Sequence, residues 1–273
     1  DPVLSRGLGD VYKRQMTGQH NTGATYALSL SGSTSITAGT GVTLESLNNN
    51  TGTIALLSSG GINGGSGTVL MRAANYAFGG ADRTITTTGV LTIQPDADEN
   101  SFASSFDNQY LNPVNVTGLT LGKSSNASAI TLSRAISLSG PVSIYGGSID
   151  VNANITANSG NILLDADTGS TLNQSSTGIL LDDAITIETV TSGNLTLIGR
   201  SGDTGSGFDG IDASSANTTT LRSAGNLTLQ GYSYAASGSG RGVDLNNDVI
   251  AASGTVSMSC LLYTSDAADD SLR

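Results

Sequence analysis

The chain has 273 residues, 36 glycines, no tryptophan and a formal net charge of −11 at pH 7. So acidic a chain is a poor partner for nucleic acid or an anionic membrane surface, and no apolar run approaches the ~20 residues that a membrane-spanning helix needs. Few aromatics argue against a conventional compact core, whereas abundant Thr, Val, Ile and Leu in short alternating runs argue against disorder. We therefore expect an all-β chain.

The two ends of the chain differ in character from everything between them. The first fifteen residues, DPVLSRGLGDVYKRQ, and the last fourteen, CLLYTSDAADDSLR, lack the Gly-, Ser-, Thr- and Asn-rich pattern of the body. Both can be reverse-translated, in order and in phase, into the transposon end and the two adapter arms of a sequencing library. We therefore interpret 1–15 and 260–273 as adapter-derived artefacts. The remaining 16–259 is then expected to be an internal fragment of a longer protein.

Short apolar strands recur throughout 16–259. They are three to five residues long, and Gly or Asn interrupts them every six to twelve residues. Related openings return with a period of about 20–30 residues, at Gly41, Gly52, Gly67, Gly89, Gly118, Gly140 and Gly160. This pattern predicts a parallel β-solenoid with about three short strands per coil.

One repeat shows how such a coil would be built. The segment SIDVNANITANSGNILL (148–164) aligns without gaps on GVDLNNDVIAASGTVSM (242–258). Strand alternation then directs Ile149 and Val151 inward and Asp150 outward. Glycine and asparagine fall at the corners, where they tolerate positive φ at low cost. The motifs SGNLTL and AGNLTL repeat the closing strand between these two segments.

A series of β-sandwich modules is the alternative fold. It would require longer strands, more buried aromatic residues and hairpin turns between alternating runs. The segment INGG (62–65) is the single candidate for such a turn. The solenoid therefore accounts for more of the sequence.

Residues 115–164 resemble a known family. The phrases GLTLGK, AISLSGPVSIYGG and ITANSGNILL are similar to the repeat region of large secreted bacterial exoproteins of the filamentous-haemagglutinin and adhesin type. The resemblance implies a right-handed parallel β-helix, export to the cell surface or medium, and a role in adhesion or biofilm formation. It also implies surface glycans or proteins of a host or the environment as partners. The repeats of that family carry no catalytic residues, so the resemblance transfers none.

Two acidic segments could supply oxygen ligands to Ca²⁺. The segment SGDTGSGFDGID places Asp203, Asp209 and Asp212 in a Gly-rich stretch, although calcium-binding β-rolls need several stacked copies of such a motif. The segment QPDADEN clusters Asp96, Asp98 and Glu99 but has no glycine where a calcium loop would bend. An ordinary insertion loop is the simpler interpretation of each, so we assign no metal ligand.

A glycan-active enzyme or phage tailspike built on the same coils is the alternative function. Its carboxylates would come from Asp182-Asp183 or from Asp165 and Asp167. Neighbouring residues on a strand face opposite sides, however, so Asp182-Asp183 offers at most one carboxylate to a groove. The segment YSY (232–234) is the best candidate for a sugar-stacking platform. We therefore expect a non-catalytic chain and assign it no catalytic or cofactor-binding residue.

Overall fold

A computed structural model describes most of the chain. The described residues are 14–18, 26–46, 52–57, 60–97, 99–166, 176–182, 184–203, 206–213, 218–234, 239–246 and 248–262. They form 28 strands and no helix, which confirms the all-β prediction.

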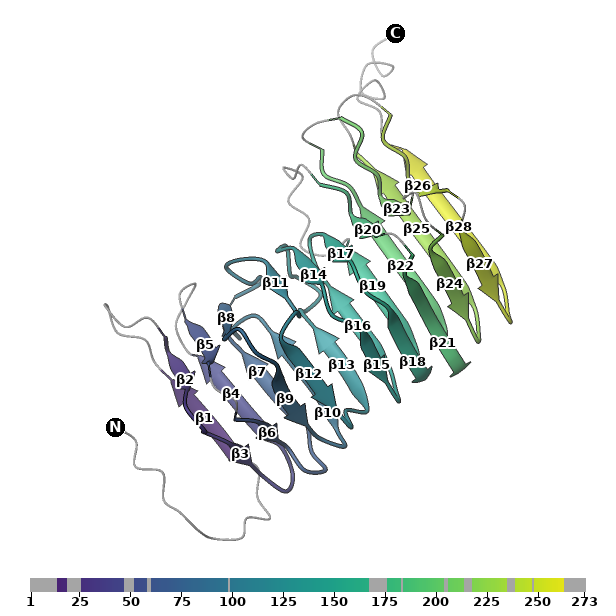
Figure 1. The fold of residues 1–273 in the computed structure, drawn as a ribbon. Helices are drawn as coiled ribbons and strands as arrows, with labels where there is room; N and C mark the ends of the chain where they lie inside the picture. Colours follow the sequence, from purple (N-terminus) through teal and green to yellow (C-terminus); the bar gives the residue numbers. More distant parts are fainter. Residues whose placement is uncertain are drawn as a thin grey trace.

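One side of every coil belongs to a single continuous sheet, the ten-stranded sheet. Every third strand of the chain joins it, and its strands pair in parallel. Figure 1 shows them stacked side by side from the purple to the yellow end. They are β1 (Arg14–Gly18), β4 (Val42–Ser46), β7 (Val69–Arg72), β10 (Val90–Gln94), β13 (Gly118–Leu121), β16 (Val142–Tyr145), β19 (Ile162–Ala166), β22 (Leu195–Arg200), β25 (Leu227–Ser233) and β28 (Val256–Leu262).

The second side of the coil consists of two sheets in succession. The three-stranded sheet comprises β2 (Leu28–Leu30), β5 (Thr53–Leu56) and β8 (Asn75–Phe78). The six-stranded sheet follows with β11 (Phe106–Asp107), β14 (Ile130–Leu132), β17 (Ile149–Val151), β20 (Ile179–Leu181), β23 (Ile211–Ala213) and β26 (Val243–Leu245).

The third side is divided in the same way. The four-stranded sheet comprises β3 (Ile36–Thr37), β6 (Ile62–Asn63), β9 (Arg83–Thr86) and β12 (Leu111–Val114). The five-stranded sheet comprises β15 (Ile136–Leu138), β18 (Ile155–Ser159), β21 (Thr186–Ser192), β24 (Thr220–Ser223) and β27 (Val249–Ala252). Three strands per coil in parallel register confirm the parallel β-helix. INGG is not a hairpin, because β6 pairs in parallel with β3 and β9.

Apolar side chains of successive coils stack in columns inside the helix. In the ten-stranded sheet one column runs through Val142, Ile162, Leu195 and Leu227, which are in register and fully buried. In the six-stranded sheet β17 has the predicted alternation, with its two apolar residues buried and its Asp half-buried on the outer face. Each fully buried side chain of this size stabilises the fold by about 1.5–3 kcal/mol. The coils above and below provide that burial.

Asparagine side chains link the corners that precede the ten-stranded sheet. The Oδ1 atom of Asn161 accepts the backbone N–H of Asn194 at 2.8 Å, and Asn194 accepts that of Asn226 at 2.8 Å. Asn226 in turn accepts the N–H of Thr255 at 2.9 Å. The preceding residue Gly193 has a φ of 114°, a conformation that favours glycine. The repeated Gly-Asn pair is therefore a corner motif in which each coil caps the next.

A second set of glycines brings the ten-stranded and six-stranded sheets into close approach. A Cβ added to Gly199 would lie 2.0 Å from the carbonyl oxygen of Gly210, and one added to Gly231 would lie 1.8 Å from that of Gly242. No side chain fits at such distances. The next position in this register is Cys260, the first residue that the sequence analysis assigned to adapter.

The structure describes a few residues on the outer side of the predicted boundaries. Strand β1 begins at Arg14, and β28 continues through 260–262 in register with β25. Leu261 and Leu262 are 43% and 56% exposed, but Val256 and Met258 of the same strand are 42% and 47% exposed, so this exposure does not distinguish 260–262 from the rest of β28. Tyr263 and the rest of the tail lie outside the described residues. The adapter assignment stays a prediction, which the nucleotide sequence of the gene would test.

We expect Gly231→Ala to destabilise the fold strongly, because the new methyl group would overlap the Gly242 carbonyl. Overpacking of this kind costs about 1–3 kcal/mol or more. Gly80→Ala is the matched control, since nothing lies within 4 Å of its added Cβ, and its effect should stay below ~1 kcal/mol. Chemical denaturation of both variants measures the difference. Equal stability of the two would contradict the close approach of the sheets.

Candidate functional site

Two breaks interrupt the stack while the ten-stranded sheet continues past them. At the first break, β8 ends the three-stranded sheet and β11 begins the six-stranded sheet. At the second, one coil later, β12 ends the four-stranded sheet and β15 begins the five-stranded sheet. Strand β12 contains Pro113, which has no N–H to donate to a following strand, and Asn115 follows with a φ of 58°. These residues explain why the four-stranded sheet ends there.

Aromatic rings occupy the first break. Tyr76 and Phe78 come from β8, and Phe106 from β11. The Tyr76 ring packs edge-on against Phe102 and Phe106, with ring centres 5.8 and 5.7 Å apart. Phe102 and Phe106 stack on each other at 5.6 Å. Edge-to-face and offset rings attract each other beyond their buried area, so this cluster joins two sheets that share no ladder of backbone hydrogen bonds.

A pocket of about 190 Å³ remains open beside the rings. Phe102 and Phe106 are buried beneath it, whereas Tyr76, Phe78 and Tyr110 are half-buried in its wall. The Tyr76 hydroxyl donates to the Gln94 carbonyl at 2.8 Å, and burial raises its pKa well above the usual value. The polar lining residues are Asn75, Ser104, Ser105, Asp107 and Gln109.

The polar rim is already ordered by hydrogen bonds. Asp107 accepts the backbone N–H of Gln109 at 2.9 Å and the hydroxyl of Ser133 at 3.1 Å. Ser104 donates to the side-chain oxygen of Asn75 at 2.8 Å across the break. The pocket therefore presents a positioned carboxylate and an amide beside aromatic surface.

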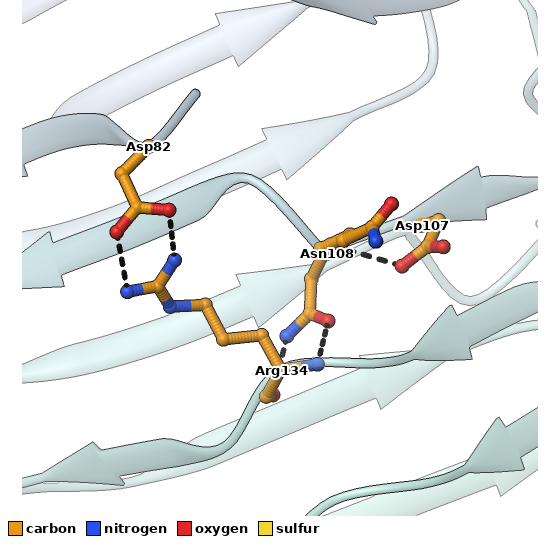
Figure 2. Close-up of polar contacts among 5 residues, drawn as sticks. Asp82, Asp107, Asn108 and Arg134 are labelled. Atoms are coloured by element: carbon orange, nitrogen blue, oxygen red, sulfur yellow. Dashed lines mark hydrogen bonds and ion pairs between the residues drawn. The ribbon is translucent and has the colours of Figure 1, made fainter. Parts of the chain in front are cut away.

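An arginine clamp next to this rim spans the break (Figure 2). Arg134 contacts Asp82 through two parallel hydrogen bonds, of 2.5 and 2.8 Å. Asn108 belongs to the coil between that of Asp82 and that of Arg134. Its side-chain amide donates to the Arg134 backbone carbonyl, and its side-chain oxygen accepts the Arg134 backbone N–H, each at 2.9 Å. The Arg134 guanidinium lowers the pKa of the Asp82 carboxyl. The clamp thus connects the two coils that line the pocket with the coil that follows them.

The second break also leaves a cavity, of about 440 Å³. Thr88, Asn115 and Val116 line it from the four-stranded side, and the segment 137–139 lines it from the five-stranded side. Small residues dominate this lining, and it contains neither an aromatic ring nor a charged group. It offers fewer directed contacts to a ligand than the first pocket.

The Gly-Asp segment contributes to an acidic cluster whose members differ from the three that the sequence motif groups together. Carboxylate oxygens of Asp209, Asp212 and Asp244 lie within 4.8 Å of one another, and this group does not include Asp203. Asp244 comes from the next coil, because β26 pairs with β23 in register. Three carboxylates at this spacing are an oxygen-ligand set of the kind that Ca²⁺ prefers.

Arg241 contacts two members of this cluster. Asp209 is 5% exposed and accepts the backbone N–H of Arg241, while the Arg241 guanidinium pairs with Asp244. Burial raises the pKa of Asp209, and the carboxylates of Asp212 and Asp244 raise it further, against the lowering effect of the Arg241 hydrogen bond. The protonated form of Asp209 is therefore favoured by folding.

We expect Asp209→Asn to raise the thermal midpoint at pH 7. The amide keeps an acceptor for Arg241 and removes repulsion across the rungs, which is worth about 0.2–1 kcal/mol. Because the folded pKa of Asp209 is raised, its ionisation costs stability as pH rises from the unfolded value through the folded one. The advantage of the variant should therefore vanish in acid, where the wild-type carboxyl is protonated.

Calcium should leave the wild-type midpoint unchanged, because Arg241 already offsets charge in the cluster. Melts with millimolar Ca²⁺ and with a chelator test this directly. A chelator-sensitive midpoint that Asp209→Asn abolishes would instead make the three carboxylates metal ligands.

The other acidic residues singled out in the sequence do not converge. Asp165 lies on β19 of the ten-stranded sheet, whereas Asp182 follows β20 on the six-stranded side. Asp167, Asp183 and Asp98 lie outside the described residues. Asp96 is buried, and the Lys123 ammonium donates to the backbone carbonyls of Asp96 and Glu99. Two backbone oxygens of that loop therefore already accept hydrogen bonds from the Lys123 ammonium.

Carboxylates form a column on the outer face of the six-stranded sheet. The register places Asp107, Asp150, Asp212 and Asp244 at equivalent positions, with Thr131 and Leu180 between them. Burial raises the pKa of Asp150, and the carboxylates of Asp182 and Asp107 add to the effect. The column gives this side of the solenoid a negative surface that begins at the pocket.

The aromatic pocket is the feature that sequence reasoning missed. YSY was the best candidate in the sequence for a sugar-stacking platform, but the Tyr234 ring faces the Arg200 guanidinium at 5.0 Å and Ser233 is buried. The sequence did contain one signal for it, the spacing of two phenylalanines: Phe78 and Phe106 are 28 residues apart, about one coil, in a chain with four phenylalanines.

No protein-family model, curated protein or solved structure matches the chain. No helix in the described part has the length and apolar character to span a membrane.

Proposed function

We propose that the chain is a structural and adhesive repeat segment of a secreted or surface-exposed bacterial exoprotein of the adhesin type, without catalytic activity. The observation that supports this most is the uninterrupted ten-stranded parallel sheet, in which each coil donates backbone hydrogen bonds to the next. The resemblance of 115–164 to adhesin repeats agrees with it. Surface glycans or proteins are the proposed partners.

Such a stack suits a rigid, extended surface protein. Its stability is distributed, because each coil is held by its nearest neighbours and no single residue dominates. Its outward positions are mainly polar: Thr196, Thr228 and Ser257 follow one another in an outer column of the ten-stranded sheet, after Leu163. A surface of this kind stays solvated along its length while exposing many equivalent sites for contact.

A scan of inward and outward residues tests the proposal. We expect Ile162→Asp to disrupt its coil and the neighbouring coils, because an unpaired charge would be buried between stacked strands. Asp182→Asn, an exposed substitution, should change the free energy of unfolding by less than ~0.5 kcal/mol. It should also leave adhesion to glycan- or protein-coated surfaces intact. Denaturation and adhesion assays of both variants provide the comparison.

An enzyme predicts the opposite result from the same scan. One outward carboxylate, such as Asp150 or Asp182, would then control glycan turnover while contributing little to folding. Loss of a measurable glycan-cleaving activity on replacing one such residue, with the thermal midpoint unchanged, would overturn the proposal.

A further inference from the structure

Aromatic residues are concentrated at the first break beyond what joining two sheets requires. The chain has only four phenylalanines and eight tyrosines, yet three phenylalanines and two tyrosines line this one pocket. The buried pair Phe102 and Phe106 already closes the core. Tyr76, Phe78 and Tyr110 instead keep part of their surface open to the pocket. Open aromatic surface next to a preformed hollow is typical of a small-ligand site.

The size of the pocket limits the ligand. At about 190 Å³ it is smaller than the ~300–1,000 Å³ of pockets that enclose drug-sized molecules. It can therefore take one ring, or one unit of a longer chain whose other units stay in solvent. The mouth of the pocket is polar, with Ser104, Ser105 and Gln109 exposed there.

The polar groups define the chemistry of that ring. A carboxylate has about four lone-pair positions, and Asp107 uses one for the Gln109 N–H and one for the Ser133 hydroxyl. The remaining positions can accept hydroxyl hydrogens of a ligand. Asn75, Ser104, Ser105 and Gln109 add uncharged donors and acceptors. The negative charge of Asp107 and of the carboxylate column disfavours an anion.

We propose that the pocket binds a single neutral pyranose ring, as a unit of a surface glycan. The apolar face of such a ring would lie against the half-buried Tyr76, Phe78 and Tyr110, and its hydroxyls would bond to Asp107 and the uncharged rim. This ligand class rests on the proposed adhesive function for its biological setting, but the contacts themselves do not depend on it.

An alkylammonium ion is the competing ligand, because aromatic rings and a carboxylate also attract cations. The arrangement favours the sugar because the rim offers four uncharged polar side chains for one carboxylate. Several hydrogen-bonding groups suit several hydroxyls better than one methylated cation.

Saturation-transfer NMR on the full 273-residue chain tests the proposal, with methyl glycosides of glucose, galactose, mannose and N-acetylglucosamine as probes. We expect at least one to bind, and Tyr110→Ala to weaken it about threefold to tenfold. Asp107→Asn keeps an acceptor but replaces a charge-assisted hydrogen bond with a weaker neutral one, so it should also weaken binding, by about threefold to tenfold. Tyr145→Ala is the matched control, a half-buried tyrosine outside the pocket lining, and should not change affinity. Should Tyr110→Ala fail to fold, Gln109→Ala takes its place, because Gln109 is an exposed residue of the pocket rim.

The outcomes separate the pocket from the proposed function. Tetramethylammonium binding that Asp107→Asn abolishes, without pyranoside binding, would overturn the sugar assignment. Absence of pyranoside binding to a chain that still adheres to surfaces would overturn the pocket proposal and leave adhesion standing. Pyranoside binding by a chain that adheres to nothing would support the pocket and overturn the adhesive function.

Discussion

Backbone hydrogen bonding between coils is the constraint on which the rest of the structure depends. A strand of two to seven residues cannot satisfy its N–H and C=O groups within its own coil, so its partners lie in the coils before and after it. Ile162 donates to the Asn194 carbonyl and Leu195 to that of Asn226, each at 2.9 Å. The ~4.8 Å spacing of paired strands then forces side chains at equivalent positions into columns. Residues in the inward columns must be apolar, and residues in the corner columns must tolerate the backbone conformations of sharp turns.

The same constraint explains where a ligand site can arise. Within an unbroken sheet, equivalent residues stack too closely to leave a hollow. At the first break, β8 and β11 are not paired, so aromatic rings and the clamp between Arg134 and Asp82 replace the missing ladder. The ten-stranded sheet continues past the break and keeps the coils in register. A pocket with chemically varied walls is thus built without interrupting the stack.

Much of this architecture could be predicted from the sequence. The inward positions of Ile149 and Val151, the Gly-Asn corners and the three strands per coil follow from local alternation and the repeat. The two breaks could not be predicted in this way, because they depend on which strands of different coils pair. For the same reason the sequence motif groups Asp203 with Asp209 and Asp212, whereas inter-coil register brings Asp244 to Asp209 and Asp212. The aromatic pocket combines residues from two coils that show no local motif.

Hydrogen exchange of the backbone amides tests the central claim most directly, because exchange reports the free energy of opening for each segment. If coils stabilise their neighbours, the amides of Ile162 and Leu195, in the middle of the unbroken ten-stranded sheet, should be among the slowest to exchange. The amides of Ala27 and Leu57, whose bonds belong to the short three-stranded sheet, should exchange much faster. Equal protection of these two sets, or faster exchange at Ile162 and Leu195, would contradict the account.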